Sequence, residues 1–193
     1  MSRKVHKRPT QDPTPLIAAR LRDQRRRRGW SLDELGARAG VSKAMLSKLE
    51  RGESSPTAML LGRICGAYGI TMSALVALPG EGGGRLVRRT DQPVWRDPQS
   101  HYVRRQVSPL SDLPLQLVEV ELPAGAEAAF PAAAYAFIRQ LVWVLGGRLE
   151  FVEGETVHRL GRGDCLELGA PADCVFRNRG RSTCRYVVAL ARR

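Results

Sequence analysis

The feature that most constrains this chain is the run from Ser31 to Arg51, S-L-D-E-L-G-A-R-A-G-V-S-K-A-M-L-S-K-L-E-R. Apolar residues recur at helical spacing in both halves of the run, so each half predicts a short helix with one apolar face. Gly40 stands between the halves, where a sharp turn needs a residue that adopts a positive φ without strain. Two short helices packed across a tight turn form a helix-turn-helix, whose second helix enters the major groove of DNA.

Local signals mark the ends of both helices. Ser31 is followed three residues later by Glu34, a pair typical of a capping box, whereas Ser42 lacks the acidic partner and predicts an N-cap alone. Gly36 allows the second backbone to come close to the first helix. Gly52 follows the last helical residue, as a C-cap does.

The chain from about residue 15 to residue 78, including the continuation E-R-G-E-S-S-P-T, resembles the XRE family of lambda-repressor-like DNA-binding domains. That resemblance implies a bundle of five helices. The first helix is expected to run to about Arg28, with Thr14 as N-cap and Pro15 at its first position. The two helices after the run are expected at 57–68 and 71–78.

The resemblance also implies roles for single residues. Arg25 and Glu50 match an ion pair of the family, which we interpret as structural. Lys43, Ala44 and Lys48 match its base-reading positions: lysine donates to guanine, and an alanine methyl packs on thymine. Helix geometry exposes a slightly larger set of side chains on the second helix, and those at the two ends of this helix are expected to contact phosphate. The predicted DNA-binding residues are Ser42, Lys43, Ala44, Ser47, Lys48 and Arg51.

The charge of the chain lies in the same half. Residues 1–90 contain 18 Lys and Arg against 7 Asp and Glu, whereas residues 91–193 contain 13 against 12. The positive electrostatic field of the N-terminal half favours double-stranded DNA as the binding partner. The Arg25–Arg28 run either favours the helix dipole or contacts phosphate. Because one helix reads few base pairs, we expect a homodimer on an inverted-repeat operator.

The remaining sequence divides into a tail, a linker and a second domain. Residues 1–13 are basic and lack an apolar period, which predicts a disordered tail, and 14–78 form the helical domain. P-G-E-G-G-G lies in a predicted linker at 79–93. No apolar run has the length of a leader or a membrane span, so we predict a cytoplasmic protein. The four cysteines contain no C-x-x-C pair, which argues against a zinc knuckle or disulfide framework.

Residues 94–193 predict an all-β domain. Short segments rich in β-branched and aromatic residues alternate with Gly, Pro or Asp turns, which is typical of a small sandwich or barrel. The fold class expected for the whole chain is therefore α+β, with an all-α domain followed by an all-β domain. The clearest predicted strands are 113–122, 137–145, 148–153, 164–168, 174–178 and 184–190.

The order of these strands and turns, roughly from residue 113 to 190, resembles the cupin family of jelly-roll barrels. Its second motif aligns from Gly163 to Asn178 and places Cys174 at a metal-ligand position. Its first motif places Pro131, Ala133 and Gln140 at the other three. Since Pro and Ala cannot ligate a metal and Gln is a weak donor, the resemblance implies a barrel with no metal, no cofactor and no catalytic residue.

The combination of a metal-free barrel with a DNA-binding domain predicts a transcriptional regulator whose cupin domain dimerises and senses a small-molecule effector. The residues expected around the effector are Arg139, Gln140, Trp143, Cys174 and Phe176. Three alternatives stay open. In the first, the barrel is an enzyme with an atypical site. In the second, the cupin domain only dimerises, and in the third, Cys174 joins Cys165 or Cys184 in a soft metal or redox site.

Overall fold

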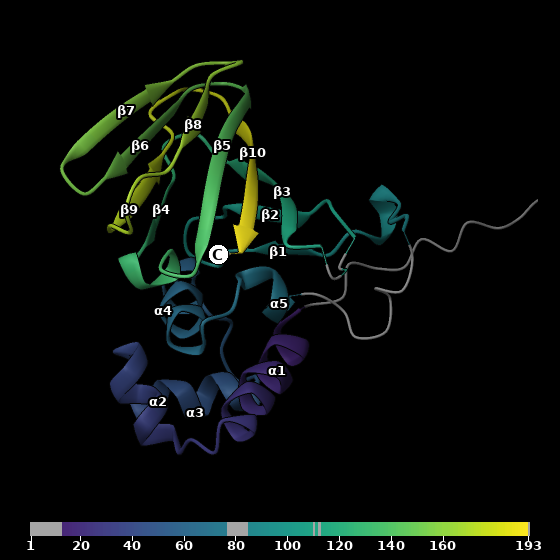
Figure 1. Ribbon diagram of the computed structural model, residues 1–193, viewed down its shortest axis with the longest axis vertical. Helices are drawn as coiled ribbons and strands as arrows, with labels where there is room; N and C mark the ends of the chain where they lie inside the picture. The colour runs from purple at the N-terminus through teal and green to yellow at the C-terminus, as the bar shows by residue number, and fades with distance from the viewer. Residues whose placement is uncertain (1–12, 77–84, 110, 112, 193) are drawn as a thin grey trace, which may run out of the picture.

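The computed structural model describes residues 13–76, 85–109, 111 and 113–192, and divides them into helices followed by antiparallel strands (Figure 1). The predicted basic tail up to residue 12 and the part of the linker at 79–84 lie outside the described residues. Among the helices that are described, none is long and apolar enough to cross a membrane.

The helical part is the predicted bundle of five. Helix α1 is the longest and packs against α3 and α5, while α2 packs against α3 and α4. Helix α1 begins differently from the prediction, since Pro13 is the N-cap and Thr14 is the first helical residue, with a mostly buried side chain. Helices α4 and α5 each begin one residue later than predicted. The helices are α1 (Thr14–Arg27), α2 (Leu32–Ala39), α3 (Lys43–Arg51), α4 (Ala58–Tyr68) and α5 (Met72–Val76).

The predicted end signals of α2 and α3 are confirmed. Ser31 Oγ accepts the Glu34 N–H, and Glu34 accepts the Ser31 N–H at 2.6 Å, which completes the capping box. Gly40 has a φ of 64°, as a left-handed C-cap requires. A Cβ on Gly36 would lie 2.7 Å from the Val41 carbonyl oxygen, so glycine there lets the turn pass close to α2.

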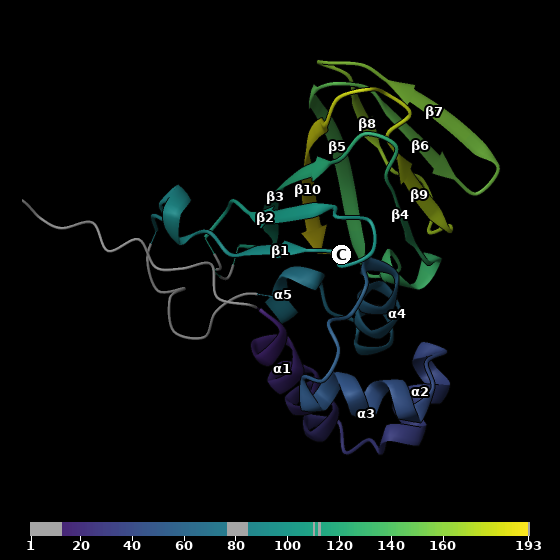
Figure 2. The same cartoon turned by 180° about the vertical axis from the view of Figure 1, so that it is seen from behind.

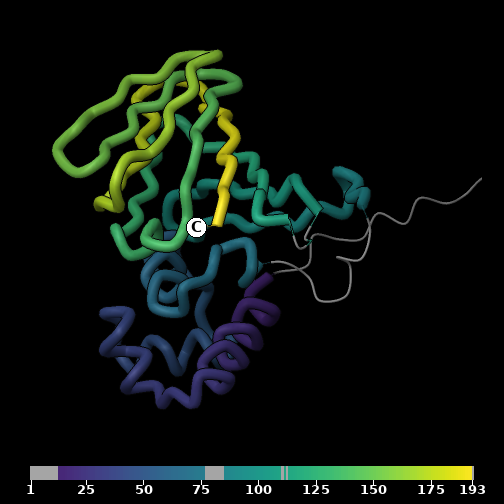
Figure 3. The backbone as a smooth tube through the Cα atoms, viewed as in Figure 1, coloured from purple at the N-terminus to yellow at the C-terminus, as the bar shows by residue number. Residues whose placement is uncertain are grey.

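The β part consists of two sheets. One sheet has six strands in the order β1-β2-β3-β10-β5-β8, and the other has four in the order β4-β9-β6-β7. All pairings are antiparallel, and the sheets face each other as in a jelly roll (Figure 3). The strands are β1 (Val94–Arg96), β2 (Val103–Gln106), β3 (Leu115–Leu122), β4 (Glu127–Phe130), β5 (Ile138–Gly146), β6 (Leu149–Glu153), β7 (Thr156–Leu160), β8 (Cys165–Glu167), β9 (Cys174–Arg177) and β10 (Cys184–Arg192).

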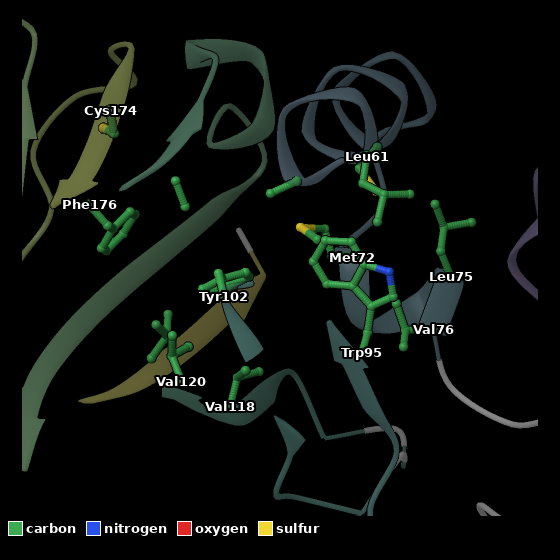
Figure 4. Packing of buried hydrophobic residues seen from close by; sticks show 14 of the residues in the cluster. Leu61, Met72, Leu75, Val76, Trp95, Tyr102, Val118, Val120, Cys174 and Phe176 are labelled. Atoms are coloured by element: carbon green, nitrogen blue, oxygen red, sulfur yellow. The ribbon is translucent and has the colours of Figure 1, made fainter. Parts of the chain in front are cut away.

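The two parts share one hydrophobic core. Helices α4 and α5 lie directly beneath one end of the sheets, which both ribbon views show (Figure 1, Figure 2). The indole of Trp95 in β1 is fully buried, and it lies beside Met72 and close to Leu75 and Val76 of α5 (Figure 4). Burial of an aromatic ring of this size is worth several CH₂ groups of transfer free energy, so the contact favours a fixed arrangement of the domains.

Two glycines let α4 approach the β domain. A Cβ on Gly66 would lie 2.9 Å from the backbone of Ala133, and one on Gly62 would lie 3.2 Å from side-chain atoms of Phe130 and Pro131. Ala133 belongs to η2 (Ala132–Ala134), a 3-10 turn between β4 and β5. Small residues on α4 therefore set the distance between the domains.

We expect Gly66→Ala to loosen this contact. Alanine stabilises an isolated helix by about 1 kcal/mol relative to glycine, but here the added methyl meets backbone that must shift. The melting temperature should therefore fall, and protease should cleave between the domains sooner. Gly146→Ala, whose added Cβ meets nothing within 4 Å, is the control. A melting temperature raised by Gly66→Ala would show that the contact is not tight.

Candidate DNA-binding helix and barrel cavity

Helix α3 presents the side chains predicted to contact DNA. Leu46, Leu49 and Glu50 are buried against the bundle. The opposite side exposes Ser42, Lys43, Ala44, Lys48 and Arg51, with Ser47 half-buried. The Ser42 hydroxyl accepts the Met45 N–H at 3.3 Å, so this side chain also caps the helix.

Besides Ser42, three of the cationic or polar side chains on this surface already have partners. Lys43 Nζ lies 2.7 Å from Asp33 of α2, and both side chains are exposed. Arg51 hydrogen-bonds to Ser47 and to Glu53. Among the described residues, Lys48 has no ion-pair or hydrogen-bond partner, so its ammonium group is the most available donor on α3.

The predicted pair of Arg25 and Glu50 is confirmed as a structural feature. Arg25 Nε and Nη2 each donate to one carboxylate oxygen of Glu50 at 2.7 Å, which is the bidentate geometry of a strong ion pair. This bond to Glu50 raises the pKa of Arg25. Arg25 also donates to the Trp30 carbonyl oxygen at 2.8 Å. The pair thus joins α1, α3 and the turn after α1.

The rest of the arginine run mostly serves the fold. Arg28 donates to the Tyr68 carbonyl oxygen at 2.6 Å, which satisfies the C-terminal end of α4. Arg27 forms an exposed i,i+4 ion pair with Asp23 at 2.8 Å. These contacts favour the structural interpretation of both side chains, and they leave Arg26 as the exposed member for which no such partner is described.

A cavity of about 50 Å³ lies where the barrel meets the helical domain. Its floor comes from the end of α4 and the start of α5, with Cys65, Ile70, Thr71 and Met72. Its walls come from the inner faces of β2, β5, β9 and β10, and include Tyr102, Arg104, Gln140 and Phe176. A second hollow of about 220 Å³ lies outside it and shares Tyr135, Ile138 and Gln140 with the cavity.

Only part of the predicted effector set lines this cavity. Gln140 and Phe176 do, whereas Cys174 is buried nearby but is not among its lining residues. Arg139 points to the outer surface, where it lines the second hollow beside Glu167. The prediction for Trp143 is wrong: this side chain is 49% exposed on the outer face of β5. Alternation along the strand sends Arg139, Leu141 and Trp143 outward and their neighbours inward.

Two of the positions that the resemblance assigns to metal ligands do not face the interior of the barrel. Pro131 and Ala133 lie on η2 or next to it and face α4. Burial raises the pKa of Cys174 to about 12, so this thiol stays protonated near neutral pH. In the described parts of the chain, no three His, Cys, Asp or Glu side chains are placed together as a metal site would need.

Sequence reasoning missed the residues that join the two domains. Asp97, which follows β1, accepts the Ala58 N–H of α4 at 2.9 Å and thereby caps a helix of the other domain. Arg104 donates to Ser73 at 2.8 Å, and Thr71 donates to Gln116 at 3.2 Å. No local pattern reveals these contacts, because Y-V-R-R-Q at 102–106 reads as a polar edge strand.

Comparison with known proteins gives a consistent result. Residues 21–75 match a family model described as helix-turn-helix. Over 174 residues, the chain is 29% identical to the HTH-type transcriptional regulator SutR of Escherichia coli, covering 89% of this chain and 92% of the relative. It is 35% identical over 65 residues to the uncharacterized HTH-type transcriptional regulator y4dJ of Sinorhizobium fredii, covering 34% of this chain and 84% of the relative.

A solved structure shares the whole fold. The crystal structure of an HTH_3 family transcriptional regulator from Vibrio cholerae aligns with a TM-score of 0.77 at 24% identity. The alignment covers 93% of this chain and 97% of that one. The order of a helical domain followed by a β domain therefore occurs in both proteins.

We expect Glu50→Gln to destabilise the helical domain by about 1–3 kcal/mol, because it leaves the half-buried Arg25 guanidinium without its counter-charge. Urea unfolding followed by circular dichroism measures the change. Glu53→Gln breaks an exposed pair with Arg51 on the same helix end and should have little effect. Equal losses in both variants would contradict a special role for the buried pair.

Proposed function

Because this chain belongs to the XRE family of helix-turn-helix transcriptional regulators with a C-terminal cupin domain, we propose that it binds a specific DNA operator as a homodimer and responds to a small molecule held in its barrel. The observation that carries the DNA-binding part is the exposed face of α3, which holds Lys43, Ala44 and Lys48 between two capped ends. These side chains supply two cationic donors and one methyl group, which is a set suited to base edges.

Electrostatics supports the same partner. The N-terminal 90 residues carry 11 net positive charges, and the remaining residues carry one. Because the helical domain is cationic and the β domain is nearly neutral, the phosphate backbone attracts the helical domain and orients it toward the DNA. Affinity is therefore expected to fall steeply with salt.

Lys48→Ala tests the assignment of base contact. Selection from randomised duplexes first identifies an operator, and binding is then measured at several salt concentrations. Loss of a base contact should weaken specific binding by about 1–3 kcal/mol and relax the preference at one position. Arg159→Ala removes an equal charge from the exposed surface of β7 and is the control. An equal loss on all sequences, with a salt slope lower by about one, would assign Lys48 to phosphate instead.

The homodimer is supported by an apolar surface on the outer face of the six-stranded sheet. Neighbouring strands place Leu141 and Trp143 of β5 opposite Ala189 and Val187 of β10, and Leu115 extends the row on β3. Leu115, Leu141 and Trp143 are 44–49% exposed, which is unusual for large apolar side chains on one face of a sheet. A two-fold axis through this face buries the same surface on both copies.

We expect Trp143→Glu to weaken the dimer by roughly 100-fold or more, since a two-fold axis places two new charges in one interface. Analytical ultracentrifugation at micromolar concentration measures the effect, and circular dichroism should be unchanged. Val157→Glu alters a valine that is 46% exposed on the four-stranded sheet and should leave the dimer intact. A dimer that withstands Trp143→Glu would place the interface elsewhere.

The effector role is supported by the position of the cavity between the two domains. A ligand there contacts α4 and α5 as well as the barrel, so it changes the free energy of one domain arrangement relative to another. A cupin that only dimerises remains the main alternative, and ligand-induced thermal shift separates the two. A cupin enzyme would need stoichiometric metal in the purified protein, which elemental analysis measures.

A further inference from the structure

A buried cation lies at the junction of the two domains. Arg104 is on the inner face of β2 and is only 8% exposed. Its Nη2 donates to the hydroxyl of Ser73 in α5 at 2.8 Å. No carboxylate among the described residues lies within ion-pair distance of this guanidinium. A charge removed from water normally has a counter-charge, so the position of Arg104 needs an explanation.

The neighbouring residue shows what a paired arginine looks like on the same strand. Arg105 points to the outer face and lies 3.8 Å from Glu119, which also pairs with Arg89 and Arg185. Three arginines thus share one carboxylate outside the barrel, while Arg104 inside has only uncharged partners. The nearby Asp97 is already used, because its carboxylate accepts backbone N–H groups of Ala58 and of the turn after β1.

The guanidinium of Arg104 lines the cavity between the domains together with polar groups and a larger apolar surface. Gln140 and Thr71 also line this cavity, as does the phenol ring of Tyr102. The Tyr102 hydroxyl oxygen accepts a hydrogen bond from Arg104, and burial keeps this hydroxyl neutral by raising its pKa, so its own proton can be donated to a ligand. Ile138 and Phe176 supply an apolar wall.

From this arrangement we propose that the cavity binds a small organic monocarboxylate with a short apolar body, whose carboxylate pairs with Arg104 and whose body packs on the aromatic and aliphatic wall. The inference rests on the proposed effector role and adds the class of ligand. One guanidinium matches the single charge and two oxygens of a carboxylate. A phosphate would bring more charge into a mostly apolar site that has no second cation among its lining residues.

The size of the cavity links binding to movement of the helical domain. A volume of about 50 Å³ is far below the 150 Å³ or so of a cavity that takes up benzene, so a ligand must displace part of the lining. Four of the lining residues, Cys65, Ile70, Thr71 and Met72, belong to the helical domain. The Ser73 contact uses one of the five N–H donors of Arg104, so a carboxylate can pair with the others beside it. Binding therefore acts on the domain arrangement by displacing the part of the lining that α4 and α5 supply.

The test uses thermal shift of the full-length protein with acetate, butyrate and benzoate, and with butyramide as a neutral isostere, at constant ionic strength. We expect at least one carboxylate to raise the melting temperature by a few degrees in a saturable manner, and butyramide to have no such effect. The same carboxylate should change operator affinity several-fold. Absence of a saturable shift with all three carboxylates overturns the proposal.

Two variants assign the effect to Arg104. Arg104→Met removes the charge but keeps the length of the side chain, so the carboxylate shift should vanish while the melting temperature without ligand is kept or rises. A purely structural arginine predicts a fall instead. Arg105→Gln makes an equal charge change on the outer face and should keep the carboxylate shift. An equal shift in wild type and Arg104→Met overturns the proposal.

Failure of the carboxylate site and failure of the proposed function give different results. A neutral ligand that alters operator affinity in wild type and Arg104→Met alike would keep the sensing function and overturn the carboxylate site. Loss of operator binding in Lys48→Ala, measured without any ligand, reports on the DNA-binding function alone.

Discussion

Helix α4 is the element on which the rest of the structure depends, because it is buried by both domains. On one side it packs against α2 of the helix-turn-helix, and on the other it packs against β4 and η2 of the barrel. Ile64 and Leu61 are fully buried, and Gly62 and Gly66 allow the close approach to the β domain. The DNA-binding helix is therefore held at a defined position relative to the barrel by one shared core.

Polar contacts at this junction give it the capacity to change. Asp97 caps α4, Arg104 binds Ser73, and Thr71 binds Gln116, so each contact joins one domain to the other. A typical hydrogen bond contributes about 1 kcal/mol net, and coupling between sites is typically about 1–3 kcal/mol. The exchange of one or two such contacts is enough to alter the balance between domain arrangements.

The sequence predicted the helices well because their signals are local. Ser31 with Glu34, and Gly40 in the turn, act within a few residues and need no knowledge of the fold. The prediction of strands was less complete: β1 has only three residues, and the short β2 and β4 carry mostly polar or small residues, so these strands lack the apolar alternation of β3 and β5. Arg139 and Gln140 were both expected in one pocket, but consecutive strand residues point to opposite faces, and the sequence did not fix which one faces inward.

The segment at 131–133, where the resemblance to cupins expects two metal ligands, contacts helix α4 of the other domain. In the cupin family this part of the barrel is where the resemblance places two metal ligands, whereas here Pro131 contacts the space beside Gly62, and Ala133 lies against Gly66. A segment that supports α4 cannot at the same time turn two imidazoles into the barrel. The inner face presents Arg104, Gln140 and the phenol ring of Tyr102 toward the cavity, which is a set of polar groups suited to an anion. The barrel thus presents polar side chains suited to reversible binding of a small molecule, and these lie next to α4, the helix that positions the helix-turn-helix.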